Sequence, residues 1–173
     1  MRKLIFVSFI LLASCNGPAG EVKTSAAVTE NTTEQKESRN KATALASLNG
    51  LQNNNIDEVL KNADKAMVDY GDGSMPPAKG RDTVRAMLTG WMSALQNYKG
   101  SNITTVAEGD QVFVYADWSA TFKEDFMGMK TAGKTFNVKD VDIFTFNDAG
   151  NIIAHRNILP MEALLSSMER NNN

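Results

Sequence analysis

Residues 111–122 read Gln-Val-Phe-Val-Tyr-Ala-Asp-Trp-Ser-Ala-Thr-Phe, and every second side chain in this stretch is apolar. Successive side chains of a β-strand point to opposite faces of its sheet, so this alternation predicts a strand with one face in the core. The predicted core face carries Val112, Val114, Ala116, Trp118, Ala120 and Phe122. The opposite face places Phe113 and Tyr115 among polar residues, which indicates a second covered surface such as a dimer contact.

Two further strands are predicted after this one, at about residues 134–146 and 152–159. Asp148-Ala149-Gly150-Asn151 lies between them and is typical of a hairpin turn. One face of the first of these strands carries Val138, Asp140, Asp142, Phe144 and Phe146, and one face of the second carries Ile153, His155, Asn157 and Leu159. Three strands joined by short connections predict an antiparallel meander.

Apolar residues at helical spacing flank this meander. The elements predicted before it are helices at 42–51, 56–60 and about 80–100, and a short strand at 64–70. Asn55 is the predicted N-cap of the second helix, Gly100 closes the third, and Pro160 starts a last helix after the meander. Helices first and a long meander afterwards predict an α+β fold.

Asp142 and His155 are polar residues on strand faces that are otherwise largely apolar. A buried carboxylate needs a partner, and a hairpin turn at 148–151 places residue 142 roughly opposite 155 or 157. Two interpretations of the predicted Asp142–His155 contact stay open. It is either an acid/base pair at the floor of an apolar pocket or a structural hydrogen bond that holds the sheet together.

Three more residues are candidates for shaping a ligand pocket. They are Tyr70 at a strand end, Trp118 on the core face of its strand, and Asn157 near His155. Ordinary core packing is the alternative for Trp118, and a capped, half-exposed position is the alternative for Tyr70.

Composition excludes several classes of function. The chain has 173 residues with 18 basic and 20 acidic side chains, and a net charge of −2 offers little attraction for nucleic acid. One cysteine and one histidine exclude an internal disulfide and a conventional Cys/His zinc site. Glycine-rich nucleotide loops and a Gly-x-Ser-x-Gly elbow are absent from the sequence, so no cofactor, no metal and no serine triad are expected.

The N-terminus has the pattern of an export signal. Arg2 and Lys3 precede an apolar run from Leu4 to Ala13, which is too short to span a bilayer as a helix. The run ends in Leu12-Ala13-Ser14-Cys15, which resembles the lipobox of bacterial lipoproteins. The resemblance implies that residues 1–14 are removed and that Cys15 is acylated and anchors the chain. The alternative is a free Cys15 thiol behind an uncleaved anchor.

Residues 15–40 are predicted to be a flexible tether behind this anchor. From residue 16 to 40 the chain is rich in Thr, Ser, Glu, Ala and Asn and contains no aromatic residue, so it has little apolar surface to bury. The folded domain is then expected at 41–173. Asn16 follows the cysteine, and by resemblance to lipoprotein sorting patterns this favours the periplasmic face of an outer membrane.

Several stretches of the domain recur, in order, in one known family. They are 45–60, Gly80-Arg81-Asp82-Thr83-Val84-Arg85, Glu108-Gly109-Asp110-Gln111-Val112, Phe126-Met127-Gly128-Met129 with Gly133-Lys134, Val141-Asp142-Ile143-Phe144, and Asn151-Ile152-Ile153-Ala154-His155. Residues 42–168 thereby resemble the SnoaL-like polyketide cyclases. These belong to the nuclear-transport-factor-2-like superfamily, together with ketosteroid isomerase and limonene epoxide hydrolase.

The resemblance implies a curved antiparallel sheet wrapped around N-terminal helices, with a ligand cavity inside the cone and usually a dimeric assembly. It also implies cofactor-independent chemistry in which an aspartate handles a proton next to a carbonyl. Asp142 matches the family's Asp-Ile-Phe pattern. His155 matches the histidine of a Glu-His-Trp segment, which reads Ala154-His155-Arg156 here.

The sequence therefore favours a lipid-anchored domain of the cell envelope that binds a small apolar molecule. In this hypothesis Asp142 and His155 perform isomerase-, cyclase- or hydrolase-type acid/base chemistry, and Tyr70, Trp118 and Asn157 shape the site. The alternative is a non-catalytic ligand-binding or dimeric interaction module in which the Asp142–His155 pair is structural, because a fold does not determine a function.

Overall fold

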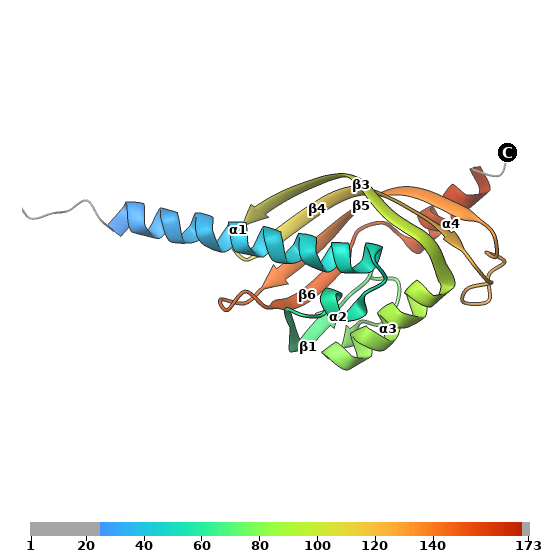
Figure 1. Cartoon of the computed structure of the whole chain (residues 1–173), viewed down its shortest axis with the longest axis horizontal. Helices are drawn as coiled ribbons and strands as arrows, with labels where there is room; N and C mark the ends of the chain where they lie inside the picture. Colours follow the sequence, from blue (N-terminus) through green and yellow to red (C-terminus); the bar gives the residue numbers. More distant parts are fainter. Residues whose placement is uncertain (1–24, 171–173) are drawn as a thin grey trace, which may run out of the picture.

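The computed structural model describes the backbone of residues 25–170 and the side chains of residues 32–168. The predicted signal peptide at 1–14, the anchoring Cys15 and the first part of the predicted tether lie outside the described residues. The described chain forms one curved sheet with helices packed against it (Figure 1).

The sheet has six strands in the order β2-β1-β6-β5-β4-β3. Their bounds are β1 Ala63–Asp69, β2 Ala78–Lys79, β3 Leu95–Glu108, β4 Gln111–Phe122, β5 Thr135–Phe146 and β6 Ile152–Asn157. Neighbouring strands run antiparallel, except that β1 lies parallel to β6. The α+β class is confirmed, and the sheet is mixed rather than purely antiparallel because β1 joins the free side of β6.

Within residues 25–170, four helices accompany the sheet: α1 Ser25–Gln52, α2 Ile56–Val59, α3 Arg81–Ala94 and α4 Met161–Arg170. Figure 1 shows α1 lying across the sheet, with α2 and α3 beside it. The predicted cap of α2 is confirmed, since the Asn55 side chain accepts a hydrogen bond from the backbone N–H of Glu58 at 3.1 Å. The helix that follows Pro160 is confirmed as α4.

The core lies between α1 and the inner face of the sheet. On β4 the predicted alternation is confirmed, because its even-numbered side chains from Val112 to Phe122 are at most 4% exposed. Ala44 and Leu48 of α1 belong to the same buried cluster, together with Phe136 and Phe144 of β5. One face of the meander is therefore covered by α1, and the other faces outward.

The N-terminal half of α1 differs from the prediction of a flexible segment up to residue 40. Residues 25–40 are helical, and Asn40 is completely buried. Lys36 pairs with Asp148 at 3.0 Å, and the Glu37 carboxylate accepts a hydrogen bond from the N–H of Gly109 at 2.8 Å. The sequence did not reveal this part of the helix because it has few apolar residues. Instead, polar side chains bind it to two turns of the sheet.

The second difference concerns residues 95–108, where the sequence analysis ended a helix near Gly100. α3 ends at Ala94, and β3 begins at the next residue. β3 is an edge strand in which Leu95 alone is buried, so no apolar alternation marks it. Gly100 lies opposite Trp118 inside the strand, and a Cβ at position 100 would come within 2.4 Å of the Trp118 ring. This glycine permits a close contact rather than ending a helix.

Candidate functional site

Three polar side chains meet on the inner side of the sheet, where β1, β6 and β5 lie next to one another. The two ring nitrogens of His155 contact two carboxylates: Nδ1 lies 2.9 Å from Asp69 Oδ2, and Nε2 lies 3.2 Å from Asp142 Oδ1. The three side chains are largely buried, with exposed fractions of 19% for His155, 7% for Asp69 and 12% for Asp142. The predicted contact between Asp142 and His155 is thus present, and Asp69 extends it.

The strand pairing explains why these residues meet. Asp69 is the direct register partner of His155 in the parallel β1–β6 pair, and Phe144 is the partner of His155 in the antiparallel β5–β6 pair. The register shifts near the start of β6, where Ile152 rather than Ile153 lies opposite Phe146. Ile152 is therefore buried while Ile153 is 37% exposed, which corrects the prediction that Ile153 shares the face of His155.

The charges of this cluster favour an imidazolium at neutral pH. Burial alone lowers the pKa of His155, but the hydrogen bonds and negative charges of Asp142 and Asp69 outweigh burial and raise the pKa to about 10. Burial raises the pKa of Asp69, and the bond to His155 together with the N–H of Gly71 brings it below its usual value. At pH 7 both nitrogens of His155 therefore carry protons and donate them to the two carboxylates.

The second oxygen of Asp142 distinguishes it from Asp69. Asp142 Oδ2 is buried and has no hydrogen-bond partner among the described residues. Asp140 lies two residues earlier on the same face, and burial together with the charge of Asp142 raises its pKa. Burial and these two carboxylates also raise the pKa of the Tyr98 phenol. Asp142 therefore has one oxygen fixed by His155 and one buried oxygen without a partner among the described residues.

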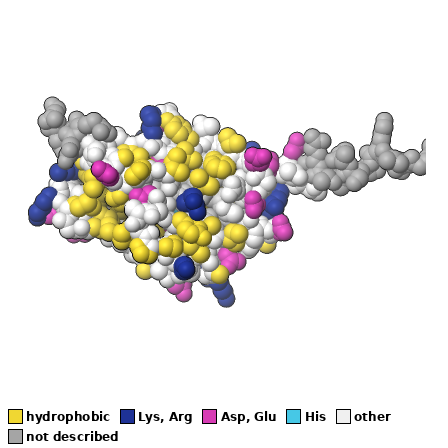
Figure 2. All heavy atoms as spheres, turned by 180° about the vertical axis from the view of Figure 1, so that it is seen from behind, with side chains coloured by type: hydrophobic (Ala, Val, Ile, Leu, Met, Phe, Trp, Pro, Cys, Tyr) yellow, Lys and Arg dark blue, Asp and Glu magenta, His cyan; other side chains and the backbone are white. Residues whose placement is uncertain are grey.

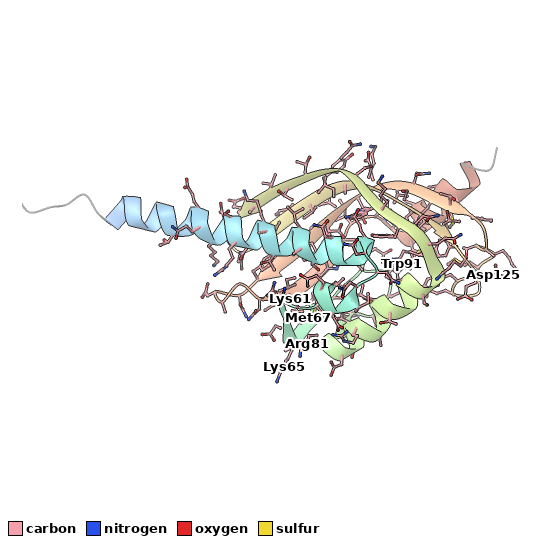
Figure 3. The ribbon with its side chains drawn as sticks, viewed as in Figure 1. Lys61, Lys65, Met67, Arg81, Trp91 and Asp125 are labelled. Carbon is pink, nitrogen blue, oxygen red and sulfur yellow. The ribbon has the colours of Figure 1, made fainter. Side chains whose placement is uncertain are left out.

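An internal cavity touches one side of this cluster. Its volume is about 40 Å³. It is lined by Asp69 and His155 and otherwise mostly by apolar side chains from α1, α2, α3 and the sheet: Ser47, Leu48, Leu51, Val59, Leu60, Ala63, Met67, Val84, Leu88, Phe144 and Ile152. Figure 3 labels Met67, which comes from β1. The space is enough for about two or three water molecules.

The other predicted site residues lie outside this lining. Tyr70 is 39% exposed, and the Arg156 guanidinium lies 4.9 Å from its ring centre. Trp118 is buried in the core and stacks on Tyr98, with ring centres 5.3 Å apart. Asn157 is the register partner of Asp142, and its side chain donates to the carbonyl of Leu159. The structure thus brings Asp142 into contact with His155, but Asp142, Asn157, Tyr70 and Trp118 all lie outside the lining of the cavity.

Asp69 and Tyr98 are the residues of this region that the sequence pattern did not indicate. Asp69 is the last residue of β1. Its contact with His155 depends on the parallel pairing of β1 with β6, and 83 positions separate Asp69 from Ile152, the first residue of β6. A carboxylate at the end of a strand was its only signal, and that signal is weak. Tyr98 belongs to the edge strand that the sequence pattern did not reveal.

The described residues contain no cluster of three or more His, Cys, Asp or Glu side chains suited to holding a metal ion. Within the same part of the chain, no helix combines the length and the apolar character needed to cross a bilayer.

The fold is that of a small α+β protein in which helices cover one face of a curved six-stranded sheet. The chain belongs to the SnoaL-like polyketide cyclase family, whose sequence pattern matches residues 41–166. No curated protein sequence matched the chain.

Solved structures agree with this family at the level of the fold. A candidate SnoaL-like polyketide cyclase from Jannaschia sp. CCS1 is 21% identical, with a TM-score of 0.68 over 76% of this chain and 92% of that chain. A candidate polyketide cyclase from Xanthomonas campestris is 15% identical, with a TM-score of 0.70 over 77% and 98%. An LEH-like epoxide hydrolase from Mycobacterium tuberculosis is 16% identical, with a TM-score of 0.63 over 78% and 92%.

Proposed function

We propose that the protein binds a small, mainly apolar molecule inside its cone and that Asp142 exchanges a proton with it, without a cofactor. The observation that carries this proposal is the arrangement around His155. One carboxylate, Asp142, has an unpartnered buried oxygen, while its other oxygen is held by a charged imidazole. A buried carboxylate that is held in place by one oxygen and has its other oxygen free is a group of the kind that general acid/base catalysis uses.

The three residues then have different roles. Asp142 is the group that takes up or delivers the proton. His155 already holds protons on both nitrogens at neutral pH, so it orients Asp142 and balances its charge rather than acting as a base. Asp69 fixes the His155 ring from the other side. Family membership supports this class of chemistry, because the family is named for polyketide cyclases.

The size of the cavity limits the ligand. Pockets for small molecules usually measure about 300–1,000 Å³, and the cavity measures about 40 Å³. Asp142 does not itself line the cavity, so a ligand must displace side chains such as Leu51, Met67 and Leu88 both to fit and to reach Asp142. Met67 is suited to this because methionine side chains are flexible and repack at low cost.

The small cavity also favours a second candidate function. If the apolar side chains stay in place, the cone is a filled core and the Asp69–His155–Asp142 cluster is structural. The protein is then a non-catalytic interaction module. The two candidate functions predict different effects of removing the Asp142 charge. A catalytic Asp142 mainly affects the reaction rate, and a structural Asp142 mainly affects the melting temperature.

The test uses exchange of the α-protons of cyclopentanone for deuterium, followed by NMR, because enolisation needs only a base next to a carbonyl. We expect the protein to accelerate exchange and Asp142→Asn to lower that rate by about 10²- to 10⁴-fold. Asp57→Asn changes an exposed carboxylate and is the matched control. No acceleration by the wild-type protein, together with a lower melting temperature for Asp142→Asn and His155→Ala, contradicts the enzymatic proposal and supports the structural one.

We further propose that Cys15 is lipidated and holds the domain at the cell envelope, on the periplasmic face of an outer membrane. The lipobox-like sequence Leu12-Ala13-Ser14-Cys15 supports this anchor. Fractionation of cells that express the full chain provides the test. We expect Cys15→Ser to move the protein from the membrane fraction to the soluble fraction, and continued membrane retention contradicts the proposal.

A homodimer is the remaining part of the proposal. It is supported by apolar side chains on the outer face of the sheet, including Val106 at 60% and Tyr115 at 38% exposure. Figure 2, seen from behind, shows hydrophobic side chains gathered on the molecular surface with few charges among them. Exposed apolar patches of this kind commonly form protein contacts.

A further inference from the structure

A second hollow lies on the outer face of the sheet, away from the cone. Its volume is about 300 Å³, considerably larger than the cavity beside His155. The residues that line it come from three neighbouring strands: Ser101 of β3, Asp117, Trp118 and Ser119 of β4, and Asn137, Val138 and Lys139 of β5. We call this hollow the outer groove. Its size is at the lower end of the range for small-molecule sites.

The edge strand creates the outer groove. The pairing of β3 with β4 shifts register twice, between Gln96 and Lys99 and between Ser101 and Thr104. Asn102 lies in the second shift with a φ of 52°, and its side chain donates to Asp117 Oδ2 at 2.8 Å. Such irregularities bend a strand locally, so β3 leaves room beside Ser101 while Asn102 fixes the groove wall.

The charged groups of the outer groove neutralise each other. Asp117 Oδ1 accepts a hydrogen bond from Lys139 Nζ at 2.7 Å, and the Tyr115 hydroxyl lies 3.4 Å from the same oxygen. One carboxylate and one ammonium leave no net charge, so the groove has no electrostatic preference for an anion or a cation. An ionic ligand would have to compete with this ion pair.

Three polar side chains of the outer groove are free to bond a ligand, and all three can both donate and accept hydrogen bonds. The hydroxyls of Ser101 and Ser119 and the carboxamide of Asn137 make no hydrogen bond to another described residue. Hydroxyl and carboxamide groups each donate and accept hydrogen bonds. Their natural complement is a ligand whose own groups do both, and a hydroxyl group has this property. A phosphate only accepts when fully ionised, and an apolar ligand would leave all three side chains unsatisfied.

We propose that the outer groove binds a neutral, hydroxyl-rich ligand of about the size of one sugar unit. Ser101, Ser119 and Asn137 bond its hydroxyl groups, and the Asp117–Lys139 pair borders the site. The ligand is either a free sugar or one unit of a glycan chain. This site is separate from the cone and does not depend on the chemistry proposed for Asp142.

The test is an NMR titration of the isotope-labelled full-length protein in detergent. The probes are N-acetylglucosamine and its β-1,4-linked tetramer. We expect saturable shifts of the backbone amides of residues 101, 119 and 137 with a millimolar Kd. Ser119→Ala and Asn137→Ala should each weaken binding by about three- to ten-fold, the effect of losing one hydrogen bond. Tighter binding of the tetramer supports a glycan chain, and equal binding supports a free sugar.

Ser93→Ala is the matched control, since Ser93 is an exposed serine of α3 on another part of the molecule, and its binding should equal that of the wild type. Glucose 6-phosphate should bind no more tightly than glucose. Absence of saturable shifts at the groove, equal binding by the two groove variants and the wild type, or a marked preference for glucose 6-phosphate would each overturn the proposal.

Discussion

His155 makes the stability of the protein depend on pH. Its pKa is raised from 6.5 to about 10, so the folded state binds this proton more tightly than the unfolded state does. The resulting stabilisation is complete below pH 6.5 and disappears as the pH rises through 10. We expect the free energy of unfolding to fall by a few kcal/mol across this range. Urea denaturation at successive pH values measures it. His155→Gln should show a much flatter profile, and an equal slope in both proteins would contradict the assignment.

Asp69 tests whether the cluster needs both carboxylates. Asp69→Asn keeps the shape of the side chain but removes the charge that faces His155 Nδ1. We expect a loss of about 1–3 kcal/mol in the free energy of unfolding, because His155 retains its bond to Asp142. Asp57→Asn alters a carboxylate that is 87% exposed, so we expect a change within about 0.5 kcal/mol. Equal effects of the two substitutions in chemical denaturation would show that Asp69 contributes no more than a surface charge.

The sequence predicted two of the three residues of this cluster, Asp142 and His155, for a clear physical reason. Asp142 and His155 belong to consecutive strands joined by a short turn, and the alternation of apolar residues fixes which face each side chain occupies. Asp69 reaches His155 through a parallel pair, which no turn connects. Local sequence patterns determine the pairing of strands that a short turn joins. They could not reveal that β1 lies next to β6 in the sheet.

The helices and strands also divide into those that local sequence patterns predicted and those that they did not. β4 and β5 were predictable to within one residue because one face of each is buried. β3 and the first half of α1 were missed because their contacts are polar or at the edge of the sheet. Arg39 donates to the carbonyl of Asp148 at 3.3 Å, and a Cβ at Gly150 would come within 2.6 Å of its guanidinium. The turn at Gly150 has a φ of 82°, which a glycine adopts without strain.

Hydrogen exchange distinguishes this docked helix from a flexible tether. We expect the amides of residues 36–40 to exchange on the order of 100-fold more slowly than in an unfolded chain, because they lie in a helix attached to two turns. The amide of Met75, an exposed residue in the loop between β1 and β2, provides the internal reference for fast exchange. Arg39→Ala should accelerate exchange at 36–40 and leave that at 44–52 nearly unchanged. Fast exchange at 36–40 in the wild type would support a tether that extends to residue 40.

The two faces of the sheet carry different groups of side chains. α1 covers the inner face, which holds the Asp69–His155–Asp142 cluster. The outer face carries the outer groove towards one end of β4 and an apolar row at the other. In this row Val106, Phe113 and Ile143 are successive register partners across β3, β4 and β5. Asp117 and Ser119 of the groove lie four and six residues beyond Phe113 on the same strand, so one face has space for both a partner and a ligand.

The apolar row gives the dimer proposal a direct test. Val106→Glu places a charge at a side chain that is 60% exposed in the monomer and buried in a dimer formed by this face. A stable interface buries about 800 Å² per partner and excludes unpaired charges from its centre. We expect the wild-type protein to sediment as a dimer and Val106→Glu to sediment as a folded monomer at micromolar concentration. Met127→Glu is the matched control, because Met127 is 61% exposed but lies in the loop between β4 and β5. A wild-type monomer, or a dimer that survives Val106→Glu and dissociates with Met127→Glu, would show that the outer face is not the interface.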